Sequence, residues 1–200
     1  PNMTAYNETC AAISMVYLFE RMFLLHGESK YIDCMERTLY NGVISGMSMD
    51  GGRFFYPNPL SSDGKYKFNA DGNTTRQPWF GCACCPSNLC RFIPSVPGYL
   101  YGVKDNNIYV NLFAGNTSTI KVNGKDVVLE ETTEYPWNGD IKIAVKKSGV
   151  KKANLLVRIP GWVRNQVVPS DLYKYSDAEK PAYSVTVNGK AVEADLNANK

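Results

Sequence analysis

Three of the six cysteines in this 200-residue chain lie within residues 82–85, and two of them are adjacent. Adjacent cysteines rarely pair with each other, because a disulfide between them closes a strained ring. A second block, Glu8-Thr9-Cys10, lies far upstream and offers a carboxylate and another thiol. Thiolates and carboxylates are metal ligands, and a thiolate is also a nucleophile. The sequence therefore predicts a metal site in which one thiolate is left for chemistry.

Zinc is the metal that best suits several thiolates and one carboxylate in tetrahedral geometry. Three other interpretations of the cysteines stay open. Six is an even count, which allows a disulfide framework in a secreted chain. A structural zinc knot would use four ligands and leave no reactive group, and the cysteines could also be unconnected. Cys34 and Cys90 fit that last case, since each lies in a helical stretch beside apolar residues and is expected to be buried.

The chain must be locally extended for these ligands to converge. Glu8 and Cys10 are two residues apart, so they project to different sides of an ideal helix. Both can bind one ion only where the chain is extended or is just entering a helix, which their place ahead of the apolar periodicity allows. Cys84 and Cys85 likewise need a turn. Pro86 is expected to supply it by biasing Cys85 away from helical dihedrals.

The first half of the chain has helical spacing, which predicts one helix from about residue 8 to 26 and another over 29–43. Residues 45–81 are instead punctuated by Gly, Pro and Asp-Gly, with one strand-like piece at 53–56. A connection of this length is usually functional or disordered. A short helix is expected after it, over residues 87–93.

After Gly98 the hydrophobic period becomes two, and two Asn-Gly pairs lie between alternating runs, which is a strong hairpin signal. The expected strands are 99–103, 107–113, 118–122, 140–145 and 154–160, with hairpins at Asn123-Gly124 and Asn188-Gly189. We therefore expect an α+β chain with two domains, a helical segment over 1–98 that carries the cysteines and an antiparallel β-sandwich over 99–200.

Composition argues against two classes of partner. The 22 Lys and Arg and 19 Asp and Glu residues are scattered, which disfavours nucleic acid and acidic membranes. No apolar run approaches the roughly 20 residues of a membrane span. Both ends look like cuts, so we treat the chain as a piece of a longer protein. Its location stays open between the cytoplasm and the periplasm or secretion.

Five blocks, in order along the chain, resemble glycoside hydrolase family 127, which includes the bacterial β-L-arabinofuranosidases. One of them is the adjacent cysteine pair, which makes the resemblance specific. The blocks are Glu8-Thr9-Cys10-Ala11, Glu36-Arg37-Thr38-Leu39-Tyr40-Asn41-Gly42, Phe55-Tyr56-Pro57-Asn58-Pro59-Leu60, Cys84-Cys85-Pro86-Ser87-Asn88 and Arg158-Ile159-Pro160-Gly161-Trp162.

The resemblance implies an (α/α)6 barrel followed by β-sandwich domains, of which this chain would hold the C-terminal barrel helices and one incomplete sandwich. It also implies one zinc ion bound by Glu8, Cys10, Cys84 and Cys85. Cys84 corresponds to the proposed nucleophile of the family. Tyr56 matches a tyrosine that lies near the sugar.

The implied activity is a retaining glycosidase that acts on arabinose-containing oligosaccharides or polysaccharides, in which a thiolate takes the place of the usual carboxylate nucleophile. The family's acid/base glutamate lies upstream of the Glu-Thr-Cys block, and only seven residues precede Glu8. We therefore expect the rest of the parent chain, with the N-terminal barrel helices, to supply it. The alternative is a non-catalytic carbohydrate-binding or scaffold module with a structural zinc site, which the β half would support.

Overall fold

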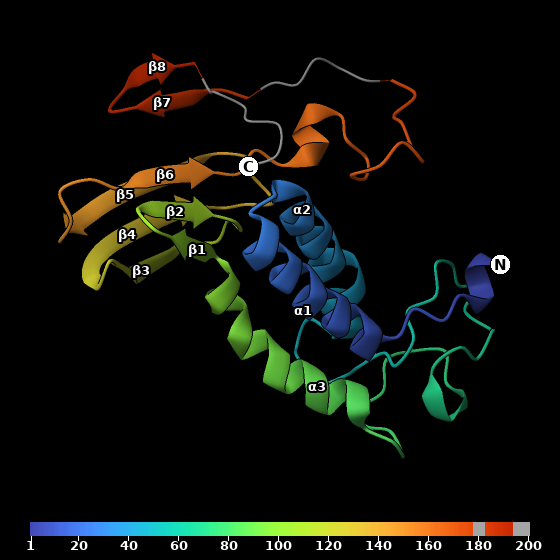
Figure 1. Cartoon of the computed structure of the whole chain (residues 1–200). Coiled ribbons are helices and arrows are strands. Elements are labelled where there is room, and N and C mark those ends of the chain that lie inside the picture. Colours follow the sequence, from blue (N-terminus) through green and yellow to red (C-terminus); the bar gives the residue numbers. More distant parts are fainter. Residues whose placement is uncertain (178–182, 194–200) are drawn as a thin grey trace. The chain divides into compact units, whose positions relative to one another are not determined.

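The computed structural model describes residues 1–177 and 183–193, and it contains both helices and sheets (Figure 1). The chain divides into two compact units. A helical unit comprises Pro1–His26 and Tyr31–Val96, and a β unit comprises Gly27–Lys30 and Pro97–Lys200. Each unit is described by itself below.

Three α-helices build the helical unit. They are α1 (Thr9–His26), α2 (Ser29–Thr38) and α3 (Cys84–Phe92). Helix α2 continues through a π-helical turn, η2 (Leu39–Val43), and a 3-10 turn, η3 (Ile44–Gly46), so the helical stretch expected over 29–43 is present but widens in its second part. Further 3-10 turns are η1 (Asn2–Thr4), η4 (Ala70–Gly72) and η5 (Ile93–Tyr99).

Helix α1 ends where Gly27 adopts a φ of +69°, a left-handed conformation that glycine accepts at little cost. Its side chains Ile13 and Val16 are fully buried, as expected for a core helix. By length and composition alone, however, α1 is long and apolar enough to cross a membrane, with a mean hydropathy of 1.2 over 18 residues. The expectation that no apolar run approaches that length was therefore wrong for this segment.

Helix α3 begins three residues earlier than the sequence predicted, and both adjacent cysteines belong to its first turn. Pro86 does not turn Cys85 away from helical geometry. In the first turn of a helix a backbone N–H has no intrahelical partner, so proline is tolerated there. Cys90, expected to be buried, is exposed because Leu89 and Phe92 occupy the inward face of α3, while Cys34 is half-buried.

The irregular segment over residues 45–81 is held by short backbone bridges, most of them within the segment and one to the residue before α1. Phe54 pairs with both Met47 and Gln77, and Pro57 pairs with Glu8. The strand-like piece expected at 53–56 therefore makes isolated bridges without becoming a regular strand. The bridge between Glu8 and Pro57 brings the segment against the N-terminus of α1, where the first ligand block lies.

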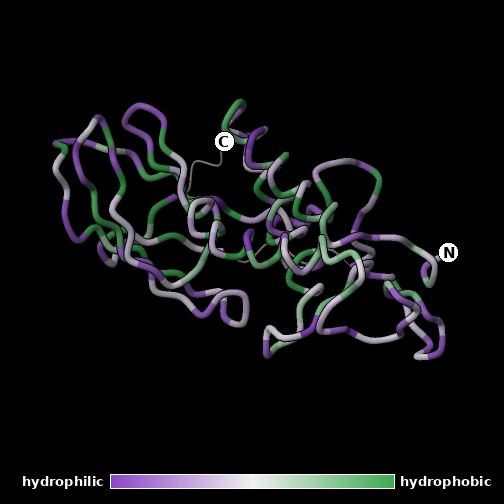
Figure 2. The backbone as a smooth tube through the Cα atoms, turned by 90° about the horizontal axis from the view of Figure 1, so that it is seen from below, coloured by the Kyte–Doolittle hydropathy of each residue, from purple (hydrophilic) through white to green (hydrophobic). Residues whose placement is uncertain are grey.

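The β unit contains two three-stranded sheets and a hairpin, and along its strands hydrophobic and hydrophilic residues alternate (Figure 2). One sheet has the order β1-β2-β6, the other β3-β4-β5, and β7 pairs with β8. The strands are β1 (Tyr101–Lys104), β2 (Asn107–Val110), β3 (Asn116–Val122), β4 (Lys125–Thr133), β5 (Ile141–Ser148), β6 (Asn154–Val157), β7 (Val185–Val187) and β8 (Lys190–Val192).

Buried residues of both sheets form one hydrophobic cluster, with Ile108 from β2 packed among residues of β3 and β4. Its members are Ile108, Ile120, Val122, Val127 and Leu129. Both predicted Asn-Gly turns are present, and all four residues have positive φ, as a two-residue hairpin turn requires. One pairing departs from the antiparallel expectation, because β2 and β6 run parallel. Alternation reports which face a residue occupies and says nothing about strand direction.

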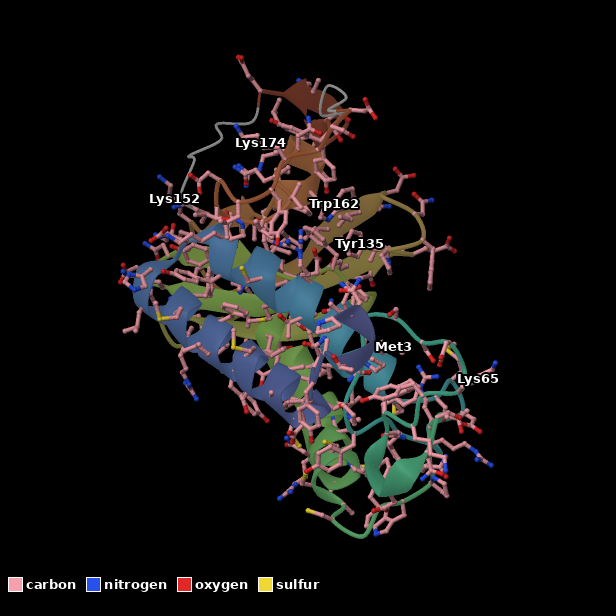
Figure 3. All side chains as sticks on the ribbon, turned by 90° about the vertical axis from the view of Figure 1, so that its right-hand side faces the viewer. Met3, Lys65, Tyr135, Lys152, Trp162 and Lys174 are labelled. Carbon is pink, nitrogen blue, oxygen red and sulfur yellow. The ribbon has the colours of Figure 1, made fainter. Side chains whose placement is uncertain are left out.

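The last of the five sequence blocks is anchored by its arginine. Arg158 is buried, its Nε donates a hydrogen bond of 2.6 Å to the Asn111 carbonyl, and its guanidinium lies 5.5 Å from the centre of the Phe113 ring. The block continues into the 3-10 turn η6 (Gly161–Arg164), on which Trp162 is half exposed (Figure 3). The arginine therefore serves the packing of the β unit.

Candidate metal centre

Thr9 explains how Glu8 and Cys10 come to face the same place. Its side chain is fully buried, and its hydroxyl donates to the Phe55 carbonyl at 3.0 Å while accepting from Asn58 Nδ2 at 3.0 Å. Gly46 leaves the space for it, since a Cβ at Gly46 would lie 2.7 Å from the Thr9 hydroxyl. With Thr9 fixed on one side, its neighbours on the chain project to the other.

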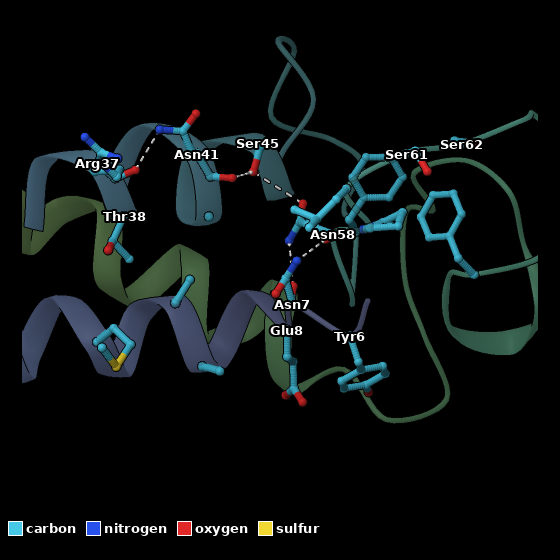
Figure 4. A pocket seen from close by; sticks show the side chains of 18 of the residues that line it. Tyr6, Asn7, Glu8, Arg37, Thr38, Asn41, Ser45, Asn58, Ser61 and Ser62 are labelled. Atoms are coloured by element: carbon cyan, nitrogen blue, oxygen red, sulfur yellow. Dashed lines mark hydrogen bonds between the residues drawn. The ribbon is translucent and has the colours of Figure 1, made fainter. Parts of the chain in front are cut away.

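The backbone here is extended up to Glu8 and helical from Thr9, the geometry that the spacing of the two ligands requires. Asn58 joins the irregular segment to the residues before α1, because its backbone N and its Nδ2 donate to the Asn7 carbonyl at 2.8 and 3.2 Å. Figure 4 shows this asparagine pair on one side of the chain and the Glu8 carboxylate pointing away from it.

Four predicted ligands converge in the helical unit. One donor atom each from Glu8, Cys10, Cys84 and Cys85 lies within 4.8 Å of all the others. The Cys84 and Cys85 sulfurs are 3.9 Å apart, and the Glu8 Oε1 lies 4.0 and 3.9 Å from them. Two thiolates bound to one tetrahedral zinc ion at about 2.3 Å would lie roughly 3.8 Å apart. The donor set therefore fits a single zinc ion in both chemistry and spacing.

Tyr56 adds a hydroxyl to this cluster, with its oxygen 3.0 Å from the Cys84 sulfur. Its carbonyl meanwhile accepts from the Thr9 backbone N–H at 2.9 Å and lies 3.8 Å from the Cys85 sulfur. The ring packs edge-on against Phe80, with centroids 5.9 Å apart. Both ends of the tyrosine therefore contact the thiols.

The three thiols differ in how readily they lose a proton. Burial raises the pKa of Cys85, which is fully inaccessible, and also that of Cys10, although a hydrogen bond from Asn88 acts in the opposite direction. Burial alone would raise the pKa of Cys84 too, but hydrogen bonds from Tyr56, Cys10 and Cys85 outweigh it, and the net pKa is lowered. Cys84 is thus the thiol most readily ionised.

Tyr56 shows the reverse shift. Its hydrogen bond with Cys84, followed by burial, raises the tyrosine pKa well above its usual value. Once Cys84 is a thiolate it has no proton to donate, so the tyrosine hydroxyl is the donor. The main causes of the pKa shifts of these three thiols are burial and hydrogen bonds with neighbouring uncharged or acidic groups, with no cationic side chain among them. Full ionisation of three thiols and a carboxylate at one point therefore needs a cation.

The third cysteine of residues 82–85, Cys82, lies outside the cluster and is exposed. All six cysteines are free, so none of them forms the disulfide framework that was left open. Sequence reasoning missed the residues that hold the Glu8-Thr9-Cys10 ligands in place, namely Thr9, Gly46 and Asn58. The only signal for the first and third was their presence inside the Glu-Thr-Cys and Pro-Asn-Pro blocks.

A groove of about 660 Å³ lies beside the N-terminus of α1. Tyr6, Asn7 and Glu8 line it, together with Arg37 and Arg76, but none of the three thiols does (Figure 4). The groove is therefore separate from the thiol cluster, although Glu8 contributes to both.

Comparison with known proteins gives the class first. Residues 1–98 match the catalytic domain, and residues 107–200 the middle domain, of the glycoside hydrolase models described as β-L-arabinofuranosidase, GH127. Both parts of the chain thus correspond to neighbouring domains of one group of carbohydrate-active enzymes. The chain belongs to glycoside hydrolase family 127.

Individual relatives agree with this assignment. A solved GH127 β-arabinofuranosidase is 58% identical with a TM-score of 0.90, and the match covers 98% of this chain and 30% of that one. A GH127 β-L-arabinofuranosidase from Geobacillus stearothermophilus T6 is 39% identical with a TM-score of 0.78, covering 96% and 28%. The non-reducing end β-L-arabinofuranosidase of Bifidobacterium longum subsp. longum is 32% identical, covering 98% and 28%. The chain thus spans less than a third of the length of these relatives.

Proposed function

We propose that the protein is a glycoside hydrolase that cleaves β-L-arabinofuranosides, or related sugars of plant polysaccharides, with retention of configuration, and that Cys84 is its nucleophile. The observation that carries the proposal is the convergence of three thiols and one carboxylate, with a tyrosine hydroxyl 3.0 Å from one of the thiols. The substrate class is taken from the relatives, which are named as β-arabinofuranosidases.

Glu8, Cys10, Cys84 and Cys85 would together hold one zinc ion. Bound zinc supplies positive charge that keeps the coordinating thiols deprotonated at neutral pH. Glu8, the harder ligand, would anchor the ion without competing for the role of nucleophile. Burial raises the pKa of both Cys10 and Cys85, so these two thiols favour their protonated forms in its absence and fit structural ligands.

Cys84 fits the nucleophile for two reasons on this chain. It is less buried than Cys85, so a substrate can approach its sulfur, and its pKa is lowered. The Tyr56 hydroxyl donates to the thiolate and holds it in one position. Because that hydrogen bond also withdraws electron density from the sulfur, we assign Tyr56 the role of orienting the nucleophile.

The reaction would take two steps. In the first, the Cys84 sulfur forms a bond to the anomeric carbon, the glycosidic C–O bond breaks, and the leaving oxygen takes a proton from a general acid. In the second, water loses a proton to the same group, its oxygen bonds to the anomeric carbon, and the C–S bond breaks to restore the thiolate. Two inversions give net retention.

The general acid would come from the parent chain rather than from residues 1–7, none of which carries a carboxyl group. In the resemblance described above, this acid is a glutamate that precedes the Glu-Thr-Cys block. The helical unit would then contribute the nucleophile, the metal ligands and the orienting tyrosine to a site that other helices complete.

The proposal is tested in the intact protein with an aryl β-L-arabinofuranoside. Cys84→Ala should abolish release of the aryl group, and Cys90→Ala is the matched control, since Cys90 lies on the same helix but is exposed and outside the cluster. Quenching the wild type in acid during turnover should reveal one pentosyl unit on the peptide that contains Cys84. Turnover by Cys84→Ala would overturn the nucleophile assignment, and glycan binding without turnover in the wild type would favour a binding module.

A further inference from the structure

Asn69 lies in the irregular segment of the helical unit, 13 residues from Tyr56, and it is buried, with 3% of its surface exposed. Its amide uses every hydrogen-bonding position it has. Oδ1 accepts from the backbone N–H groups of Tyr56 at 2.8 Å and Ala70 at 3.0 Å. Nδ2 donates to the carbonyls of Phe54 at 3.3 Å and Thr75 at 2.8 Å. A buried and saturated amide of this kind fixes the chain segments that it joins.

The Tyr56 amide differs from the backbone amides that precede it. Phe54 N donates to the Gln77 carbonyl at 2.8 Å and Phe55 N to the Gly46 carbonyl at 2.8 Å, so both have backbone acceptors. The next residue, Pro57, has no N–H. Among the N–H groups of residues 54–56, only that of Tyr56 is satisfied by a side chain. A backbone acceptor survives most substitutions, whereas this one disappears when Asn69 is replaced.

The Tyr56 amide also belongs to the residue whose hydroxyl reaches the thiol cluster. Its ring extends from the backbone to the Cys84 sulfur, 3.0 Å from the hydroxyl oxygen. A small rotation of the backbone at Tyr56 is amplified along this side chain and moves the hydroxyl oxygen relative to the Cys84 sulfur, which weakens their hydrogen bond. The position of the hydroxyl therefore depends on how firmly the backbone of Tyr56 is held.

We infer that Asn69 is a positioning residue for the nucleophile, acting through Tyr56. It holds the Tyr56 backbone, Tyr56 holds the Cys84 sulfur, and the sulfur is thereby aimed at the substrate. Asn69 itself touches neither the thiols nor the substrate. This inference rests on the proposed function, since it needs Cys84 as the nucleophile, but it assigns a role to a residue outside the ligand set.

The test is a double-mutant cycle in the intact protein with Asn69→Ala, Tyr56→Phe and both together. Each single change should lower kcat about 10-fold to 100-fold, the range expected for a misplacement of about 1 Å, with KM changed less than about threefold. If Asn69 acts through Tyr56, adding Asn69→Ala to Tyr56→Phe should lower kcat by less than about twofold more. A double variant whose loss equals the product of the two single losses would overturn the inference.

Asn73→Ala is the matched control. Asn73 lies in the same turn, and its Nδ2 donates only to the nearby Ala70 and Asp71 carbonyls, at 3.2 and 3.4 Å. It should leave kcat within about twofold of the wild type. Equal losses of kcat in Asn69→Ala and Asn73→Ala would show a general loosening of the turn and would contradict the assignment.

A spectroscopic readout is independent of turnover. With Co²⁺ bound at the thiol cluster, loss of a hydrogen bond to a sulfur ligand should move the sulfur-to-metal charge-transfer band to longer wavelength. Asn69→Ala and Tyr56→Phe should shift it by the same amount, and Asn73→Ala should not shift it. An unchanged band in Asn69→Ala alone would overturn the inference.

One further variant, together with Cys84→Ala, keeps the outcomes separable. If Asn69→Ala does not fold, Asn69→Asp is the second variant: it retains the oxygen that accepts from the Tyr56 N–H and loses only the donated hydrogen bonds, so it should leave kcat within about threefold of the wild type, and a loss of about 10-fold or more would overturn the inference. If Cys84→Ala keeps its turnover, the proposed function fails. If Cys84→Ala is inactive while the Asn69 and Tyr56 effects multiply, only the positioning role fails.

Discussion

Each unit of this protein places a tyrosine hydroxyl against an ionisable group, and the two pairs differ in their surroundings. In the helical unit the Tyr56 hydroxyl meets the Cys84 sulfur, and two more thiols and a carboxylate lie within 4.8 Å of that sulfur. In the β unit the Tyr101 hydroxyl donates to Glu131 Oε2 at 3.1 Å, and Asn116 Nδ2 lies 3.4 Å from the same oxygen. The first pair is surrounded by groups that become anionic, and the second by neutral donors.

This difference separates a site that binds from a cluster that supports the fold. Burial raises the pKa of Glu131, and burial also raises the pKa of Tyr101 to about 12. A single buried acid such as Glu131 can therefore avoid the free-energy cost of a buried charge by keeping its proton. Three thiols and a carboxylate can lower the energy of their anionic forms together only by sharing a cation. The comparison makes predictions for both units.

The largest effect is expected from metal removal. When the free zinc concentration is a thousand times the dissociation constant, zinc binding stabilises the folded state by about 4 kcal/mol. Chelation should therefore lower the thermal midpoint of the helical signal in circular dichroism, and Cys10→Ser should reduce the zinc content measured by elemental analysis. The β unit carries no comparable cluster among its described residues, so its strand signal should respond less. An unchanged helical midpoint after chelation would break the comparison.

The next effect is expected at Gly46. An added Cβ would lie 2.7 Å from the Thr9 hydroxyl and 2.9 Å from its Cγ2, and Thr9 is fully buried between two ligands. Gly46→Ala should cost about 1–3 kcal/mol in urea unfolding, the range for an overpacked core, and should weaken zinc binding. Gly52→Ala is the control, since its nearest neighbour would be Asp50 at 3.6 Å. Equal stability of the two variants would contradict the packing argument.

Glu131→Gln tests the cluster in the β unit through pH. Because the folded pKa is raised, the native state binds more protons than the unfolded state between the two pKa values, so this residue's contribution to stability is full below the unfolded pKa. It is lost as the pH rises from about 4.3, the unfolded value, through the raised value, by roughly 1.4 kcal/mol for each unit of difference. Glutamine does not titrate, so the variant should gain stability relative to the wild type across that window. Parallel urea curves for the two proteins from pH 4 to pH 7 would refute this.

The smallest effect is expected from a surface ion pair outside both clusters. Lys146 Nζ lies 3.2 Å from Glu130 Oε1, and both side chains are more than 40% exposed. Lys146→Ala should change the free energy of unfolding by less than about 0.5 kcal/mol, and high salt should remove even that difference. A loss above 1 kcal/mol would show that charge in the β unit contributes more than the comparison allows.

Several features of the fold follow from local sequence. The start of α1 after Glu8 follows from the spacing of Glu8 and Cys10, which requires an extended chain just before the helical pattern of apolar residues begins. Both hairpins follow from Asn-Gly pairs, whose residues accept positive φ. The start of α3 could not be predicted in this way. Proline disfavours helical dihedrals in the residue before it, but it is tolerated in the first turn of a helix, where backbone N–H groups have no intrahelical partner, so α3 begins at Cys84. The parallel pairing of β2 and β6 did not follow either, because it depends on contacts far apart in the sequence.

The site divides in the same way. Residue types and the family resemblance pointed to Glu8, Cys10, Cys84, Cys85 and Tyr56, and the structure brings these together. Zinc binding by the first four stays a prediction. Asn69 could not be identified from the sequence. It lies in a segment without periodicity, and its four hydrogen-bond partners are defined only once that segment is folded.

Part of the irregular segment forms an exposed loop that contributes no residue to the thiol cluster or to the Tyr101–Glu131 cluster. Residues 63–67, between Tyr56 and Asn69, are all exposed, and Asp63 caps its own turn by accepting from the Lys65 and Tyr66 N–H groups at 2.9 and 2.8 Å. A fluorophore or an affinity tag inserted there would sit in solvent, between Tyr56 and Asn69 in the sequence. The segment thus offers a built-in attachment point for observing substrate binding without altering the residues that perform the chemistry.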